Sequence, residues 1–240
     1  MLPVLAEGDD WIAVAKPPWI VVHRAKFGPR LPAALQIVRN QIGRSVWPIH
    51  RLDRQVSGCL LFGKTSEAAG RIHAELGEGR KRYVALVRGA WRLDEEEVVV
   101  ETPMKDDNGI LKDARSIVRV IATSDEPRCS LLLVEPRTGR YHQVRRHVRD
   151  LHHPVLGDAK HGDGKENRAW KARGVQRIAL HCLSVEAGPI AVTCPLFEDL
   201  AVVLRAMPWW EEAVAKLPAL GLPPILDRAQ PPKPLVPVGT

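Results

Sequence analysis

A carboxylate stands where a reactive group would be expected, just ahead of an apolar strand. Asp53 lies in residues 50–58 (HRLDRQVSG), which lead directly into the apolar run Cys59–Phe62. Such a run indicates a buried strand, and a loop at a strand edge holds a side chain firmly while leaving it open to substrate. The same pattern has a plainer interpretation, because Asp53 and Ser57 can simply organise the turn before the strand. The local sequence allows either a nucleophilic carboxylate or a turn residue.

A second segment is strongly basic. Residues 137–149 (RTGRYHQVRRHVR) contain five arginines and two histidines. After the Thr138-Gly139 turn, Val144 and Val148 recur at helical spacing, so the basic side chains would surround a short helix. Runs of charge are usually solvated helix faces. A helix N-terminus surrounded by arginines also suits phosphate binding, because its free N–H groups and partial positive charge attract anions.

Several motifs together resemble the RluA-type pseudouridine synthases, which isomerise uridine to pseudouridine in structured RNA. The motifs are HRLD followed by SG (residues 50–58), KxY followed by Ala, Val and Gly (81–89), TGRxHQxR (138–145) and HPxxGD (153–158). They occur in the family's order, and the resemblance spans roughly residues 8–205. One position departs from the family pattern, since Val56 stands where a threonine is usual.

The resemblance implies three catalytic residues. Asp53 matches the family's nucleophile, and Arg145 matches the arginine that pairs with it and keeps it ionised and aimed. Tyr83 matches the tyrosine that stacks on the target base and is a candidate for moving a proton. Without the resemblance, Tyr83 would be taken for an ordinary half-buried strand residue.

The resemblance also implies substrate-binding residues. Arg51 would fill the space left when the uridine leaves its stack, and Leu180 would line the uracil pocket. The basic segment would supply the other RNA contacts, and each phosphate contact should steepen the salt dependence of binding. These expected contacts are Arg140, His142 and Gln143, with Arg137, Arg146 and Arg149 on phosphates.

The reaction breaks the C1′–N1 bond and forms a C1′–C5 bond without net redox change, so no cofactor or metal is expected. A carboxylate can add covalently at the sugar or at the base, and the sequence does not choose between them. Residues 160–163 with Asn167-Arg168 resemble the branch that modifies a uridine in the acceptor/T-stem region of tRNA. We therefore expect tRNA as the partner, with ribosomal RNA as the alternative, and no protein partner for a monomeric enzyme.

Two other classes of function stay open. One is a non-catalytic RNA-binding protein on the same fold. The other is a metal-dependent phosphohydrolase that uses the histidines around residues 142–161. Their spacing matches neither HExxH nor a Cys/His finger, and no acid stands where a hydrolase base is needed.

Composition favours a cytoplasmic protein with a polyanionic partner. The 240 residues carry a net charge of +7, which suits RNA. The 4 cysteines form no CxxC pair, which is typical of reduced core thiols. No apolar run approaches the roughly 20 residues of a membrane span, and the acidic N-terminus does not resemble a signal peptide.

The pattern of elements predicts an α+β fold. The resemblance implies a curved, mixed and mainly antiparallel sheet with flanking helices, formed by a catalytic domain over residues 1–220. Six prolines among the last twenty residues predict an extended or disordered tail at 221–240. Strands are expected at 11–16, 58–63, 81–89, 97–101, 116–122, 130–134, 177–181 and 190–192, a short apolar return at 19–22, and helices at 32–42, 65–76, 199–207, 211–216 and after the turn at 138–139.

Overall fold

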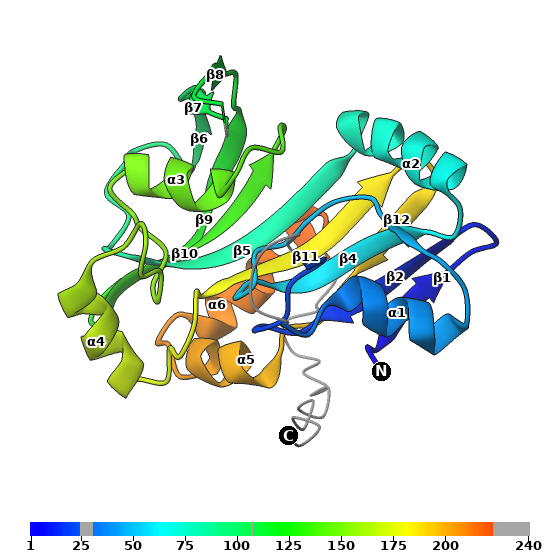
Figure 1. Cartoon of the computed structure of the whole chain (residues 1–240). Coiled ribbons are helices and arrows are strands. Elements are labelled where there is room, and N and C mark those ends of the chain that lie inside the picture. The colour runs from blue at the N-terminus through cyan, green and yellow to red at the C-terminus, as the bar shows by residue number, and fades with distance from the viewer. Residues whose placement is uncertain (25–30, 107, 223–240) are drawn as a thin grey trace.

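A computed structural model describes residues 1–24, 31–106 and 108–222. They form one long curved sheet with helices at its two ends and on its back face (Figure 1). The strands of this sheet are β1 (Val4–Glu7), β2 (Trp11–Lys16), β3 (Trp47–Pro48), β4 (Ser57–Gly63), β5 (Arg80–Arg88), β6 (Glu97–Val100), β9 (Ser116–Asp125), β10 (Arg128–Pro136), β11 (Leu180–Ala187) and β12 (Ile190–Thr193). A separate hairpin consists of β7 (Met104–Lys105) and β8 (Leu111–Lys112).

The strand order is β1-β2-β4-β11-β5-β10-β9-β6, with β3 paired to β4 and β12 paired to β11. All of these pairings are antiparallel except that of β4 with β11. The expected α+β class with a mixed, mainly antiparallel sheet is therefore confirmed. The parallel pairing places Ser57 opposite His181 and Gly58 opposite Cys182.

The close approach of β4 and β11 explains the Ser-Gly pair after the Asp53 loop. Gly58 has a φ of 125°, and a Cβ atom there would lie 2.3 Å from the Cys182 carbonyl oxygen. Only glycine fits such a position. Ser57 Oγ lies 2.9 Å from His181 Nδ1, while His181 Nε2 donates to the Cys194 carbonyl oxygen at 3.0 Å. These contacts fix the strand on which the Asp53 loop rests.

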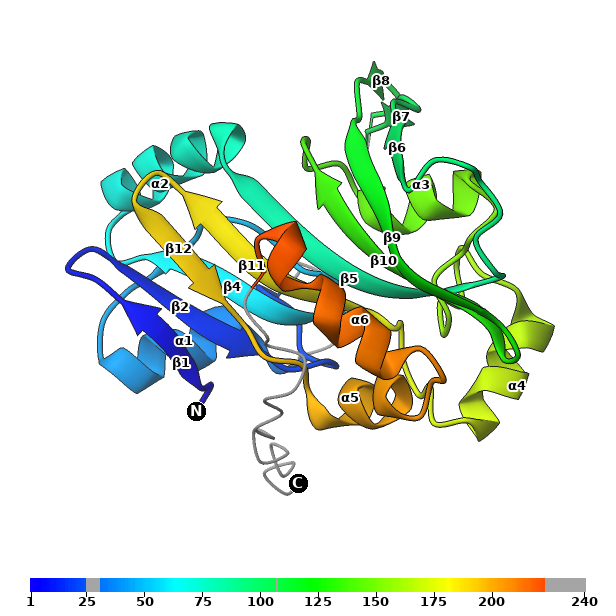
Figure 2. The same ribbon diagram turned by 180° about the vertical axis from the view of Figure 1, so that it is seen from behind.

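The helices are placed around the two halves of the sheet. In Figure 1, α1 and α2 lie against the half that contains β4, and α3 lies beside β9 and β10. Figure 2 shows α6 across the back face of the sheet. The bounds are α1 (Ala34–Ile42), α2 (Ser66–Glu78), α3 (Gln143–Asp150), α4 (Gly164–Ala172), α5 (Glu198–Arg205) and α6 (Trp210–Lys216), followed by a short 3₁₀ turn (Pro218–Leu220). No helix in the described ranges is long and apolar enough to cross a bilayer.

Most predicted elements are present, and the differences have physical reasons. The predicted strand at 177–181 is wrong, because β11 begins at Leu180 and continues to Ala187. The apolar return at 19–22 contributes only one isolated bridge, between Val21 and Ala33. Among elements of four or more residues, β1 and α4 were not predicted, and neither were the two-residue strands β3, β7 and β8. The helix α4 buries only Trp170, so its apolar periodicity is weak.

The predicted tail falls largely outside the described residues, which end at Leu222. Gly221 and Leu222 pack on the body of the protein. The Gly221 carbonyl oxygen lies 3.4 Å from Arg82 Nη1, and Leu222 is buried. The structured part of the chain therefore reaches at least to residue 222.

Candidate active site

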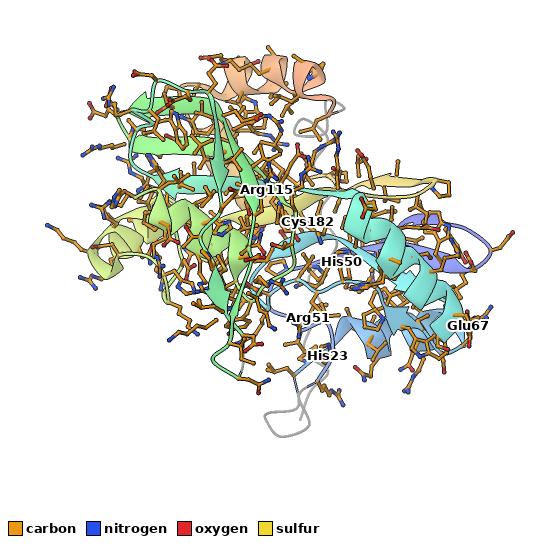
Figure 3. The ribbon with its side chains drawn as sticks, turned by 90° about the horizontal axis from the view of Figure 1, so that it is seen from above. His23, His50, Arg51, Glu67, Arg115 and Cys182 are labelled. Carbon is orange, nitrogen blue, oxygen red and sulfur yellow. The ribbon has the colours of Figure 1, made fainter. Side chains whose placement is uncertain are left out.

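A cleft of about 740 Å³ opens on the concave side of the sheet, a volume that suits a nucleotide-sized ligand. Its walls come from the loop before β4, the end of α2, the start of β5, and the segment from Pro136 into α3. Figure 3 looks down on this face, with labels on His23, His50 and Arg51, which all line the cleft. Each of the eight catalytic and substrate-binding residues named from the sequence lines it: Arg51, Asp53, Tyr83, Arg140, His142, Gln143, Arg145 and Leu180.

Asp53 and Arg145 form an ion pair across 92 residues of sequence. Arg145 Nη1 donates to Asp53 Oδ2 at 2.7 Å. The Arg145 side chain is 5% exposed and that of Asp53 is 30% exposed, so the pair is partly shielded while the carboxylate still opens to the cleft. Within the described part of the chain, no hydrogen bond engages Asp53 Oδ1. The contact implied by the resemblance is present, and the catalytic role of each residue stays a prediction.

A second carboxylate, Asp158, holds the other side of the same arginine. Arg145 Nε donates to Asp158 Oδ2 at 2.6 Å, and Arg145 Nη2 donates to Asp158 Oδ1 at 2.8 Å. This bidentate geometry fixes the guanidinium plane. The Lys160 and His161 amides also donate to Asp158 Oδ1, at 2.9 and 3.0 Å. Burial alone would raise the pKa of Asp158, but these donors and the charge of Arg145 outweigh burial and lower it.

His142 lies beside the same carboxylate. Its Nε2 is 3.7 Å from Asp53 Oδ2, and its Nδ1 is 2.9 Å from His161 Nε2. The ring stacks on Tyr141 at 3.7 Å between centroids, and the Lys160 ammonium lies over the Tyr141 ring at 5.2 Å. Burial lowers the pKa of His142 to about 4, with Arg145, His161 and Lys160 adding to the effect and Asp53 opposing it. His142 is therefore a neutral imidazole near neutral pH.

Tyr83 and Leu180 supply apolar surface within the cleft. Tyr83 lies on β5 opposite Cys182 of β11, and Leu180 starts β11 opposite Ala85. Both side chains are buried. Burial raises the pKa of Tyr83 well above its ordinary value, and Cys182 and Asp53 add to the effect. Its phenol therefore stays protonated and can donate a hydrogen bond near neutral pH.

The polar residues predicted to bind substrate divide into two kinds. Arg51 and Arg140 are exposed, which suits contact with RNA. Gln143 is buried, and its amide is fully used inside the protein. Its Oε1 accepts from Thr138 Oγ1 and the Arg140 amide, and its Nε2 donates to the Arg115 carbonyl and Ser116 Oγ. Gln143 thus shapes the turn that presents Arg140 and His142.

Three residues next to the site received no role from the sequence. Asp158 was visible as the last letter of HPxxGD, but no local signal in the sequence shows that it pairs with Arg145. Lys16 is fully buried, and its Nζ contacts the carbonyl oxygens of Pro17, Ile20 and Arg54 at 2.9, 3.0 and 3.4 Å. Arg177 is also buried and donates to the carbonyl oxygens of Ile178 and Leu180.

Four of the five histidines between residues 142 and 161 make other contacts. His147 Nδ1 contacts Ser116 Oγ, and His153 Nδ1 contacts the Arg88 carbonyl oxygen. His142 and His161 contact each other. Across residues 1–24, 31–106 and 108–222, no group of three or more His, Cys, Asp or Glu side chains is arranged to hold a metal ion.

The cleft combines a paired aspartate, a buried tyrosine and several arginines. This arrangement agrees with the known proteins to which the chain is similar. Residues 10–150 match the family described as RNA pseudouridylate synthase. A tRNA pseudouridine synthase C of Salmonella typhimurium is 33% identical over 96% of this chain and 95% of its own length. One from Vibrio cholerae is 36% identical over 88% of this chain and 98% of its own.

Solved structures agree on the fold. Human RNA Pseudouridylate Synthase Domain Containing 4 superposes with a TM-score of 0.69 at 18% identity, covering 85% of this chain and 92% of its own. The corresponding Domain Containing 1 protein has a TM-score of 0.62 at 21% identity, covering 82% and 83%. The chain belongs to the RluA-type RNA pseudouridylate synthase family. It is an isomerase that acts on RNA.

Proposed function

We propose that this enzyme converts a uridine of tRNA, in the acceptor/T-stem region, to pseudouridine, with Asp53 as the nucleophile. The observation that carries the proposal is the position of Asp53. Its carboxylate is fixed through Oδ2 by Arg145, Asp53 lines the cleft, and no hydrogen bond within the described residues engages Oδ1. The similarity to proteins named tRNA pseudouridine synthase C supports tRNA over ribosomal RNA.

The reaction requires four changes in bonding that balance without a redox partner. The C1′–N1 bond breaks and the C1′–C5 bond forms. The proton on C5 is lost, and N1 gains a proton. Asp53 Oδ1 adds covalently at the sugar or at the base, which lets the uracil detach and turn, and this bond breaks again before the product leaves, so that the carboxylate is regenerated. Because the carboxylate is already held at a fixed angle, the entropy of orienting it is lost before the reaction begins, which lowers the activation barrier relative to the reaction in solution.

The other cleft residues have roles that follow from their surroundings. The protonated phenol of Tyr83 offers a flat face for the uracil and a hydrogen-bond donor. Leu180 gives the pocket an apolar wall. Arg51, two residues before Asp53 in the same loop, fills the space that the extruded uridine leaves, which offsets part of the few kcal/mol that unstacking costs.

The remaining basic residues would bind RNA by its phosphates. Arg137 and Arg140 are exposed in the segment before α3, and Arg149 is exposed in its last turn. Contacts of this kind recognise the shape of a stem and are weakened by salt. A location in the cytoplasm, where mature tRNA is found, is part of this proposal.

Tritium release from RNA labelled at uracil C5 tests the proposal, because isomerisation detaches the C5 hydrogen. Wild-type enzyme should release tritium from a tRNA pool and not from a ribosomal-RNA pool. Asp53→Asn, which keeps size and removes the charge, should release none while its affinity for tRNA persists. Release from ribosomal RNA alone would refute the tRNA assignment, and release by Asp53→Asn would refute the nucleophile.

A further inference from the structure

Trp19 occupies a backbone position that does not suit it. It follows Pro17 and Pro18 in a tight turn and has a φ of 73°. Proline at the first central position followed by a positive φ at the second is the turn geometry that normally selects glycine. For a bulky side chain this conformation is a genuine outlier, and strain of this kind is retained mainly at functional sites.

The Trp19 side chain makes few contacts with the protein that could offset this backbone strain. Trp19 is 44% exposed, although tryptophan buries more apolar area than most side chains. Its one aromatic or cationic partner within the described residues is Arg54, whose guanidinium lies over the ring at 5.5 Å from the centroid. Core packing therefore does not explain why a tryptophan, and not a glycine, stands here.

The turn is anchored to the loop that carries Asp53. The Trp19 amide donates to the Arg54 carbonyl oxygen at 2.7 Å, and Arg54 Nε lies 3.5 Å from the Trp19 carbonyl oxygen. The buried Lys16 ammonium contacts the same Arg54 carbonyl and that of Ile20. Because Arg54 follows Asp53 directly, the indole is fixed relative to the candidate nucleophile.

Trp19 also stands at the edge of the cleft. Trp19 does not itself line the cleft, but Arg54, to which it is hydrogen-bonded, and Val21, Val22 and His23, which follow it in the chain, all do. Among the described residues, Tyr141 is an exposed aromatic residue that lines the cleft, but its ring is already stacked on His142 and has the Lys160 ammonium over it. Trp19 is thus an aromatic ring placed to meet an RNA base at this edge.

We infer that Trp19, backed by Arg54, is a stacking site for a base next to the target uridine. Extruding a uridine exposes a base face on each side of the vacated space, so Arg51 and a rigid indole can each cover one of them without regard to base identity. The Arg54 charge beneath the ring favours a nearby phosphate. The inference rests on the proposed function and adds a binding subsite to it.

The test separates binding from folding, because the two roles predict opposite effects of glycine. Trp19→Gly should relieve the backbone strain, so its melting temperature should equal or exceed that of the parent. In an Asp53→Asn background, which prevents turnover, the Kd for a tRNA transcript should rise about 5- to 150-fold, the range of base–aromatic stacking. Trp19→Tyr, which keeps a ring, should lose much less.

Trp47 provides the matched control. It is 38% exposed, and although the next residue, Pro48, lines the cleft, Trp47 pairs with Gly63 at the end of β4 opposite to Ser57, about 20 Å along the strand from the Asp53 loop. Trp47→Gly should leave the Kd unchanged. In the active enzyme, Trp19→Gly should raise KM and leave kcat within about twofold of wild type, because the base it binds does not react.

Three results would overturn the inference. The first is an unchanged Kd for Trp19→Gly, and the second is an equal loss of affinity for Trp47→Gly. The third is a lower melting temperature for Trp19→Gly together with a Kd for Trp19→Tyr that is as high as that for Trp19→Gly. The last result would show a structural role. Failure of the proposed function looks different, since wild-type enzyme would then release no tritium from tRNA. Normal release with an unchanged KM in Trp19→Gly rejects only the stacking site.

Discussion

Asp158 holds Arg145 by two hydrogen bonds, of 2.6 and 2.8 Å, from a position with no solvent exposure. Arg145 is left with Nη1 to reach Asp53. The arginine therefore links a buried, structural carboxylate to one that faces the cleft. Its two anionic partners explain how a guanidinium can be buried here, because a buried cation needs nearby compensating charge.

Asp158→Asn should damage both stability and turnover. The amide keeps the shape but removes one of the two negative charges around Arg145, and it turns an acceptor into a donor facing the guanidinium. Breaking a buried ion pair costs about 3–5 kcal/mol, so the free energy of unfolding in urea should fall by an amount in this range. The kcat for tritium release should fall about 100-fold, the effect of a misplacement of about 1 Å at a reacting group.

Asp163→Asn is the control for this change. Asp163 lies in the same loop, is exposed, and caps α4 by accepting from the Lys165 and Glu166 amides. Asparagine caps helices about as well as aspartate, so neither stability nor kcat should move. Equal effects of the two substitutions would mean that the loop, and not the contact with Arg145, is sensitive.

Arg145 should be irreplaceable by lysine. Arg145→Met leaves Asp53 and Asp158 without their shared cation, and both the melting temperature and kcat should fall. Arg145→Lys restores the charge, but a single ammonium cannot reproduce the fork that joins two carboxylates. We expect partial recovery of the melting temperature and little recovery of kcat. Arg146→Lys, at the half-buried neighbouring position, should resemble wild type in both measurements, and a fully active Arg145→Lys would contradict the account.

The sequence predicted the parts of the site that depend on local pattern. The apolar run Cys59–Phe62 became β4, of which all seven residues are buried. Thr65 caps α2 by accepting from the Ala68 amide, as its position before an apolar-periodic segment suggested. The TGRxHQxR segment led into α3 at the expected place. These features follow from spacing within one element.

The features that the sequence did not predict depend on contacts between distant elements. The strand β11 was misplaced because it contains His181 and Ser184, two polar residues that are buried. Such residues look exposed unless their partners are known, and the partner of His181 is Ser57, 124 positions away. The role of Asp158 was hidden in the same way, since nothing local shows that Arg145 is buried. Trp19 was taken for part of an apolar return, because a sequence does not display φ.

His161 should act on turnover through His142. An imidazole facing an ionised carboxylate is favoured with its N–H directed at that carboxylate, which assigns the proton of neutral His142 to Nε2, toward Asp53. Its Nδ1 must then accept, so His161 Nε2 donates.

The substitution His161→Phe removes this donor and frees His142 to change tautomer. We expect kcat to fall on the order of tenfold, as for other partners that fix a histidine tautomer, with KM and melting temperature nearly unchanged. His161→Gln, which keeps a side-chain N–H, should recover most of kcat. Loss of stability without loss of kcat would reject this role.

The stability of the protein should fall in mild acid, in part through His142. Because its pKa is about 4 in the folded protein and 6.5 as the ordinary value, the unfolded chain gains a proton between these pH values while the folded protein does not. The free energy of unfolding must then decrease as pH falls from about 6.5 to about 4.

His142→Asn suits the left-handed backbone at this position, where φ is 54°, and removes the titrating group. Its stability should therefore depend less steeply on pH, by at most about 1.4 kcal/mol per pH unit for one proton. His152→Asn is the matched control, since His152 is exposed and has a φ of 64°. Urea unfolding at a series of pH values measures the slopes. A wild-type slope in His142→Asn would show that His142 is not held neutral by its burial beside Arg145.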